Sequence, residues 1–269
     1  MEWFNSALGR NITFVRPPYF KIGGFGEVPN IGYYFAFLFC IYILSFVGNT
    51  VVMTIILLDY RLRSPKYIVV FNLAFVDLLS SSTMVPKTLD IFLFNHRTIS
   101  YSDCLAFMFF CFIFISMQSF NLVVLSYDRL IAILYPLHYH VKVTHKRILY
   151  LIAFFWIFSV TTTFCAVTLL TRISFCKSVV IKSYFCDHGP MVRLACNDIT
   201  PSMVMSGSLP ILKLGCPLVF IVATYCCIGY ALSKISTFQE RMKAFKTCTG
   251  HLSLVAIYFF PILVVQITF

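Results

Sequence analysis

Four cysteines stand between the apolar stretches of the sequence, and disulfide formation is the chemistry that they could perform. They are Cys104, Cys176, Cys186 and Cys196, and the last three are spaced ten residues apart. Disulfides persist in oxidising surroundings, and an even number of such cysteines favours two bridges, although four cysteines allow three pairings. The other seven of the 11 cysteines lie in or beside apolar stretches, where a small thiol is ordinary packing material.

Two ionisable residues, Asp77 and Lys213, stand within apolar stretches. An ionisable group inside a membrane is costly unless it is partnered, so each is a candidate functional residue. Asn49 is a polar neighbour for Asp77, either in a cation site or in a purely structural hydrogen-bond network. Lys213 could extend its ammonium to the membrane surface, or it could offer a positive charge to an acidic ligand. The residue types alone leave both pairs of alternatives open.

A third candidate is the pair Asp128-Arg129, which follows a long apolar stretch. An arginine at a helix end can be held by an adjacent carboxylate and released when a helix bundle opens towards a partner. The alternative is a charge that only anchors the end of the helix at the membrane surface.

Enzymatic chemistry finds no support in the sequence. There is no Gly-rich phosphate loop, no His-Glu-x-x-His helix and no Gly-x-Ser-x-Gly turn. His138, His140 and His145 lie close together, but a metal site needs fixed geometry and supporting contacts, so we interpret them as a solvated, partner-facing segment. We predict that the protein is not an enzyme and needs no metal.

The composition shows what must position these residues. The chain of 269 residues is 59% hydrophobic and 12% charged, with a mean hydropathy of +0.87, whereas soluble domains are about 25% charged. A soluble fold could not hide so much apolar surface. The net charge of +11 is spread between apolar stretches rather than over a polar domain, which excludes nucleic acid as a partner and favours membrane lipid.

A membrane-spanning helix needs about 20 apolar residues, and six stretches qualify. The sequence therefore predicts an all-α membrane protein, a single transmembrane bundle domain over 1–269. We expect helices at about 31–58, 67–86, 104–127, 148–171, 206–233 and 247–269. A tail at 1–30 and a long loop at 172–205 would lie outside the cell.

The orientation follows from the basic residues. The segments 59–66, 128–147 and 234–246 hold 11 Lys and Arg in 41 residues, whereas the opposite side holds nine in 87. Basic loops stay in the cytoplasm, so the N-terminus is predicted to be extracellular. The sequon Asn11-Ile12-Thr13 agrees with this, which makes Asn11 a candidate glycosylation site.

Short motifs recur in order along these stretches. They are Gly48-Asn49, Leu73 with Asp77, Pro86-Lys87, Cys104, the run from Ser126-Tyr127-Asp128-Arg129 to Tyr135-Pro136-Leu137-His138-Tyr139, Trp156, Phe185-Cys186-Asp187, Leu194-Ala195-Cys196, Tyr225, and Lys243-Ala244-Phe245-Lys246-Thr247-Cys248 with His251-Leu252. Together they resemble the odorant receptors of the rhodopsin-like G-protein-coupled class, with Leu130 in place of the usual tyrosine.

This resemblance implies specific site residues. It pairs Cys104 with Cys186 and Cys176 with Cys196. It assigns G-protein coupling to Asp128, Arg129, Tyr225 and Lys243, and a polar core, with a possible sodium ion at Asp77, to Asn49, Asp77 and Gln118. It places a small organic odorant among Cys111, Phe112, Ile115, Ser116, Lys213, Phe259, Ile262 and Gln266. No aspartate occupies the helix-three position at which amine receptors hold a cation, so an amine ligand is disfavoured.

The sequence departs from the family pattern in two respects. Pro217 and Pro261 favour a fish-type receptor. The Asn-Pro-x-x-Tyr segment of a seventh helix is absent, so we interpret the sequence as six of seven helices, ending before the last. The implied function is odorant detection at the plasma membrane through a heterotrimeric G protein. A non-signalling truncated product and, more remotely, a small multi-pass transporter are the alternatives.

Overall fold

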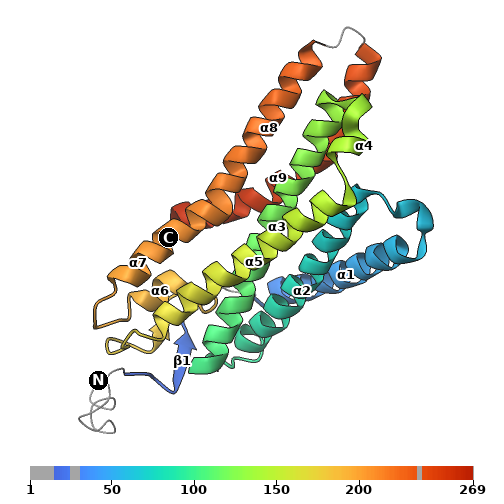
Figure 1. Cartoon of the computed structure of the whole chain (residues 1–269). Helices are drawn as coiled ribbons and strands as arrows, with labels where there is room; N and C mark the ends of the chain where they lie inside the picture. The colour runs from blue at the N-terminus through green and yellow to red at the C-terminus, as the bar shows by residue number, and fades with distance from the viewer. Residues whose placement is uncertain (1–14, 25–30, 235–237, 269) are drawn as a thin grey trace. The chain divides into compact units, whose positions relative to one another are not determined.

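The computed structural model describes residues 15–24, 31–234 and 238–268, and helices make up most of them (Figure 1). Five helices are long and apolar enough to cross a membrane, and Cys248–Val264 forms a shorter apolar helix. The five comprise α1 (Ile31–Leu58), α2 (Pro65–Phe92), α3 (Tyr101–Leu134), α5 (His145–Leu170) and a composite helix over Thr200–Ser233. The prediction of an all-α membrane bundle is confirmed.

The composite helix has three parts. They are α7 (Thr200–Pro210), a π-helical turn (Ile211–Gly215) and α8 (Cys216–Ser233). The wide turn begins directly after Pro210, whose ring cannot donate a backbone hydrogen bond and crowds the preceding turn. The last helix is α9 (Phe238–Thr268), with Pro261 inside it.

Several helices are longer than the sequence predicted. α2 continues to Phe92, α3 continues to Leu134, and α9 begins at Phe238 rather than near residue 247. The predicted helix ends were placed at charged residues, because charged residues limit which segments of the chain can lie in hydrocarbon. Helical backbone hydrogen bonds impose no such limit, so polar turns extend the helices beyond their apolar spans.

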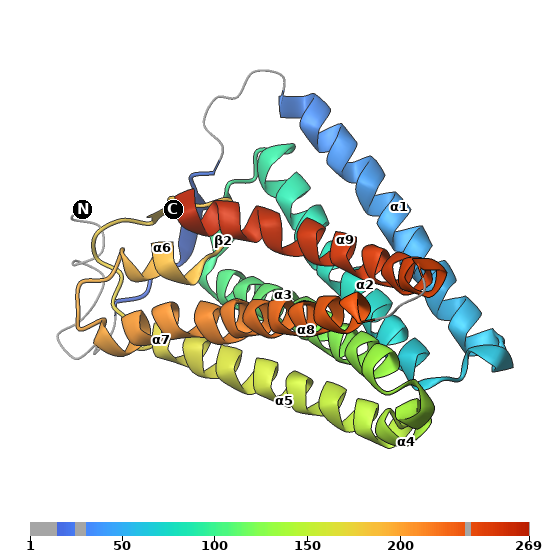
Figure 2. The same cartoon turned by 90° about the horizontal axis from the view of Figure 1, so that it is seen from above.

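A small sheet, which was not predicted, forms from three distant segments. Strand β1 (Tyr19–Ile22) lies between β2 (Thr98–Ser100) and β3 (Val180–Ile181). β1 pairs antiparallel with β2, placing Phe20 opposite Ile99, and parallel with β3, placing Lys21 opposite Val180. The short helix α6 (His188–Val192) lies beside the strands in both views (Figures 1 and 2).

The structure divides into two compact units. Unit 1 comprises Met1–Val51, Asp77–Ile115 and Phe158–Leu209; unit 2 comprises Val52–Val76, Ser116–Ile157 and Pro210–Phe269. Unit 1 contains the sheet, α6 and one large apolar cluster. Unit 2 contains the second half of α3, all of α8 and α9, the short α4 (Tyr139–Lys142), and three smaller apolar clusters.

The outer surface of the long helices is apolar as well. In α1 most residues are exposed, and Phe37, Leu44 and Leu57 are each more than 60% exposed. Water would not tolerate so large an apolar surface, whereas lipid does. The long helices are therefore consistent with a bilayer as their solvent.

Candidate functional site

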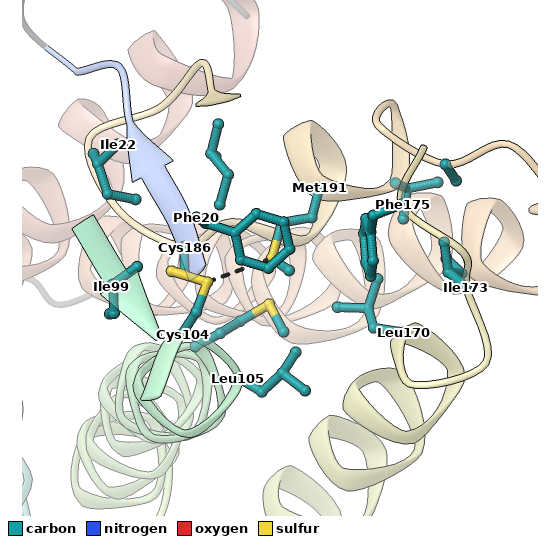
Figure 3. Close-up of a cluster of buried hydrophobic side chains, with 14 of the residues drawn as sticks. Phe20, Ile22, Ile99, Cys104, Leu105, Leu170, Ile173, Phe175, Cys186 and Met191 are labelled. Carbon is teal, nitrogen blue, oxygen red and sulfur yellow. Dashed lines mark hydrogen bonds between the residues drawn. A yellow bond between two sulfur atoms is a disulfide. The ribbon is translucent and has the colours of Figure 1, made fainter. Parts of the chain in front are cut away.

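Two disulfides fasten the end of unit 1 at which α3 begins. Cys104, in the first turn of α3, is bonded to Cys186, and Cys176 is bonded to Cys196, with Cα–Cα distances of 5.5 and 5.7 Å. These are the pairs that the family resemblance implied. The Cys104 sulfur also lies 3.8 Å from that of Met191 on α6 (Figure 3).

Around these bridges the side chains form a large apolar cluster. Phe20 and Ile22 of β1 are fully buried in it, and the Phe20 ring meets that of Phe175 edge-on with 5.3 Å between centroids (Figure 3). The preceding residues are anchored too, because the Val15 amide donates to Ser174 Oγ at 3.1 Å. We call this assembly of β1–β3, α6 and the two disulfides the cap.

Residues predicted to line the ligand pocket fall in both units. Unit 1 contains Cys111, which is buried, and the half-buried Phe112 and Ile115; Phe112 packs against the apolar cluster of the cap. Unit 2 contains Ser116 and Phe259, both buried, and Ile262, which is half-buried. The Gln266 side chain lies outside the described residues. The pocket that these residues would line stays a prediction.

Lys213 is buried in the π-helical turn of unit 2, with 5% of its surface exposed. Wide turns of this kind occur often at functional sites, because they redirect a side chain within a helix. The neighbouring Leu214 packs against an apolar cluster made by Leu122, Ile221, Val255 and Phe259. The two alternatives for Lys213, an ammonium that extends to the membrane surface and a cation that faces a ligand, both stay predictions.

The Asp128-Arg129 pair forms a compact network at the other end of α3. An Arg129 Nη2 atom lies 3.6 Å from one Asp128 oxygen, and the Tyr139 hydroxyl donates to the other at 2.5 Å. Asp128 is buried to 99%, so its charge depends on these partners. Burial, and secondarily the Asp128 carboxylate, raises the pKa of Tyr139 above its ordinary value.

Tyr139 belongs to the Pro-Leu-His-Tyr motif, and the sequence had not indicated its contact with Asp128. Its position eleven residues after Asp128, across the turn at Pro136–His138, was the available signal. The side chain of Lys243, the remaining predicted coupling residue on α9, lies outside the described part of the structure.

A second network joins three helices of unit 2. The Tyr225 hydroxyl on α8 and His251 Nδ1 on α9 are 2.6 Å apart, and His251 Nε2 lies 3.2 Å from the Leu122 carbonyl of α3. Tyr225 had been predicted to take part in coupling, whereas His251 had only been noted as a motif residue. A single histidine in an otherwise uncharged apolar stretch was the signal for this role.

A third network was missed altogether. The Asn72 amide on α2 donates to Asn121 Oδ1 on α3 at 2.6 Å, and the Trp156 indole on α5 donates to Asn72 Oδ1 at 3.1 Å. These two hydrogen bonds link three helices of unit 2. Two asparagines in apolar stretches were visible in the sequence, but nothing there indicated that they meet.

The predicted polar core comprises Asn49, Asp77 and Gln118. The Asn49 amide donates to the Ser45 carbonyl at 2.9 Å and to Ser45 Oγ at 3.1 Å, both on its own helix. Asp77 is half-buried in unit 1 and Gln118 is half-buried in unit 2. A sodium ion at Asp77 stays a prediction, and Asn11 lies outside the described residues.

Comparison with known proteins gives a consistent result. Residues 38–269 match the family model described as olfactory receptor. Human olfactory receptor 1F1 is 34% identical over 231 residues, which cover 86% of this chain and 74% of that receptor. Rat olfactory receptor 1500 is 34% identical, covering 84% and 72%, and mouse olfactory receptor 1M1 is 33% identical with the same coverage.

Proposed function

The chain belongs to the olfactory receptor family, and from this membership we propose that it binds a small organic odorant among its helices and activates a heterotrimeric G protein at the Arg129 end of unit 2. Members of this family are multi-pass membrane receptors rather than enzymes. The fish-type assignment suggested by Pro217 and Pro261 stays a prediction.

The observation that carries the coupling proposal is the network around Arg129. The Arg129–Asp128–Tyr139 contacts and the Tyr225–His251 hydrogen bond all join side chains without covalent links, and they involve α3, α4, α8 and α9. A ligand shifts such an arrangement only through its different affinity for two states. Exchange of these hydrogen bonds would release Arg129 towards the G protein.

The proposed orientation places the cap outside the cell and Arg129 in the cytoplasm. Disulfides such as Cys104–Cys186 are stable in an oxidising compartment. The segments that adjoin Arg129 also carry the denser set of Lys and Arg residues, as the positive-inside rule requires. In this orientation the glycosylation sequon at Asn11 is extracellular, and the protein resides in the plasma membrane.

The proposed ligand is a small organic molecule held by apolar and aromatic side chains. Phe112 and Phe259, which the family resemblance assigns to the ligand site, are aromatic, and Ser116 carries a hydroxyl. Buried Lys213 would favour ligands that carry an acidic group, because a buried cation is stabilised by an opposite charge. The activation of the G protein does not depend on this assignment.

Arg129→Ala tests the proposal directly. In cells that display the chain at their surface, a mixture of volatile organic compounds should evoke nucleotide exchange on a co-expressed olfactory G protein. Arg129→Ala should abolish that exchange and leave surface display largely intact. Lys146→Ala removes an exposed charge from the start of α5 and serves as the matched control. Normal signalling by Arg129→Ala would contradict the proposed coupling mechanism.

A further inference from the structure

Residues 15–24, which include β1, form a strap that joins two loops of unit 1. The Ile22 amide donates a hydrogen bond to the Arg97 carbonyl, and the Lys21 amide donates one to the Val179 carbonyl, each at 2.8 Å. β1 is the middle strand of the sheet, so within the sheet β2 and β3 are connected through the strap. We call the position between β2 and β3 the strand site.

The strap and the two strands beside it are held in different ways. Residues 15–24 contain no cysteine, so beyond the continuity of the chain they are held by hydrogen bonds and apolar packing. By contrast, β2 ends four residues before Cys104, and β3 lies between Cys176 and Cys186. The Cys104–Cys186 bridge therefore keeps the two flanking strands near each other whether or not β1 lies between them. A strand that enters a site with such walls has to order little besides itself.

The side chains of β1 determine its register in the strand site. Phe20 and Ile22 are fully buried, whereas Tyr19 is 50% exposed and Lys21 is exposed. Figure 3 shows Phe20 and Ile22 among the side chains of the apolar cluster, where the Phe20 ring meets that of Phe175. A shift by one residue would turn both buried side chains outwards. The strand site therefore selects two apolar residues that are separated by one exposed residue.

Two glycines end the strap, where its backbone passes close to its neighbours. A Cβ atom added to Gly23 would lie 3.1 Å from the Ile181 carbonyl oxygen, and one added to Gly24 would overlap the Phe92 ring. Gly24 also has a φ of +35°, which an L side chain rarely adopts. The strand site thus selects an extended segment in which the second apolar residue is followed by two glycines, as in Phe20-Lys21-Ile22-Gly23-Gly24.

We propose that β2 and β3 form a preformed peptide-binding site and that residues 15–24 are its tethered, exchangeable ligand. In strand addition of this kind, main-chain hydrogen bonds give affinity, and pockets for alternate side chains give selectivity. The strap leaves and re-enters the strand site while both disulfides stay closed, and a separate peptide of the same sequence takes its place. This property is independent of odorant binding and of coupling at Arg129.

A vacated strand site tests the proposal on the purified full chain in lipid nanodiscs. Phe20→Asp places a charge at a fully buried position, so the strap should leave the site. A fluorescent peptide with the sequence of residues 15–24 should then bind, as measured by fluorescence anisotropy. Its affinity for the Phe20→Asp chain should be at least about tenfold higher than for the wild-type chain, whose own strap competes. Tyr19→Asp places the same charge at an exposed position and should resemble the wild type.

Altered peptides test the selectivity of the strand site. A peptide carrying Phe20→Asp should bind the vacated site at least about thirtyfold more weakly than the unaltered peptide. A peptide carrying Gly24→Val should also bind more weakly, whereas Lys21→Gln changes an exposed side chain and should bind equally well. Equal binding of all four peptides would show nonspecific association. Either that result, or no binding to a folded Phe20→Asp chain with both disulfides closed, would overturn the proposal.

Hydrogen exchange in the wild-type chain decides the question even if Phe20→Asp does not fold. A strap that opens on its own should expose the Lys21 and Ile22 amides at least about tenfold more often than the Cys196 amide, which donates to the Ser174 carbonyl within the disulfide-bonded loop. Equal protection of the three amides would mean that β1 opens only together with the whole cap. That result would contradict the proposal and would leave the olfactory function unaffected.

Discussion

The two ends of α3 are fastened by different kinds of interaction. At its first turn, in unit 1, Cys104 is covalently bonded to Cys186, and strand β1 is hydrogen-bonded to two other segments. At its last turns, in unit 2, Asp128 contacts Arg129 and accepts a hydrogen bond from the Tyr139 hydroxyl. The cap thus has cross-links that no ligand can exchange, whereas the Arg129 end has hydrogen bonds that can be replaced one by one.

This difference suggests a division of labour along one helix. The two disulfides restrict the cap to one geometry. The Arg129 end must instead adopt two arrangements of similar free energy, because a signalling switch needs both. Perturbations that distinguish the two ends therefore test the comparison.

The largest effect is expected from breaking the cap. Replacing Cys104 and Cys186 together by serine removes a bridge that closes 82 residues, which stabilises by about 4.5 kcal/mol in the chain-entropy model, against about 3 kcal/mol for the 20 residues closed by Cys176–Cys196. The Cys104/Cys186 variant should show the lower thermal unfolding temperature and the lower surface display.

Cys165→Ser is the control for that experiment, because Cys165 is a free and exposed cysteine on α5. The order of the two disulfide variants matters most. If the loss of Cys176–Cys196 destabilises the protein more, the smaller loop contributes more to the stability of the cap than the Cys104–Cys186 bridge at the first turn of α3 does.

An intermediate effect is expected from acid. The pKa of His188 is lowered by burial from 6.5 to about 4, so between these pH values the unfolded chain binds the extra proton and the folded chain does not. Stability should therefore fall as pH falls through this window, by up to about 3 kcal/mol. Thermal unfolding from pH 7 to pH 4 would show the slope in the wild type and a shallower slope in His188→Phe.

His140→Phe provides the matched control for the acid experiment, since His140 is exposed on α4 of unit 2. It should retain the wild-type slope. Equal slopes in the wild type and in His188→Phe would mean that His188 does not report on the folding of the cap.

The smallest effect on stability is expected from Tyr139→Phe, which removes one hydrogen bond to a buried carboxylate, worth about 2 kcal/mol. Its effect on signalling should exceed its effect on folding, because Asp128 would hold Arg129 less firmly and basal G-protein activity should rise. Nucleotide exchange without odorant measures this. Tyr150→Phe, on an exposed face of α5, is the control. Unchanged basal activity in Tyr139→Phe would remove Tyr139 from the switch.

Much of the fold follows from the sequence because a bilayer imposes simple requirements. In hydrocarbon every backbone hydrogen bond must be formed within the segment, so a long uncharged stretch such as Ile31–Leu58 has little choice but to be a helix. The same reasoning located α3, α5 and α8. The helix ends were less well predicted, since the polar turns at Leu134 and Phe238 are not constrained by lipid.

The cysteine pairing and the coupling residues were predicted from the order of short motifs rather than from physical principles. Four cysteines allow three pairings on residue types alone, and the family resemblance implied one of them, Cys104–Cys186 with Cys176–Cys196. The sequence around Tyr139 did not identify Asp128 as its partner. The sequence around His251 did not identify Tyr225 as its partner. Each contact depends on how a helix continues or packs beyond the motif itself.

The sequence by itself determined the membrane class, the apolar helices and the residues on which coupling was expected to depend. Only the tertiary structure brought β1 between two loops, joined Asn72 to Asn121 and Trp156, and buried His188 in the cap. Hydropathy is a property of each residue, so hydropathy values can be summed along the chain. Burial and pairing are properties of segments that meet from distant parts of the sequence, so they arise only when the chain has folded.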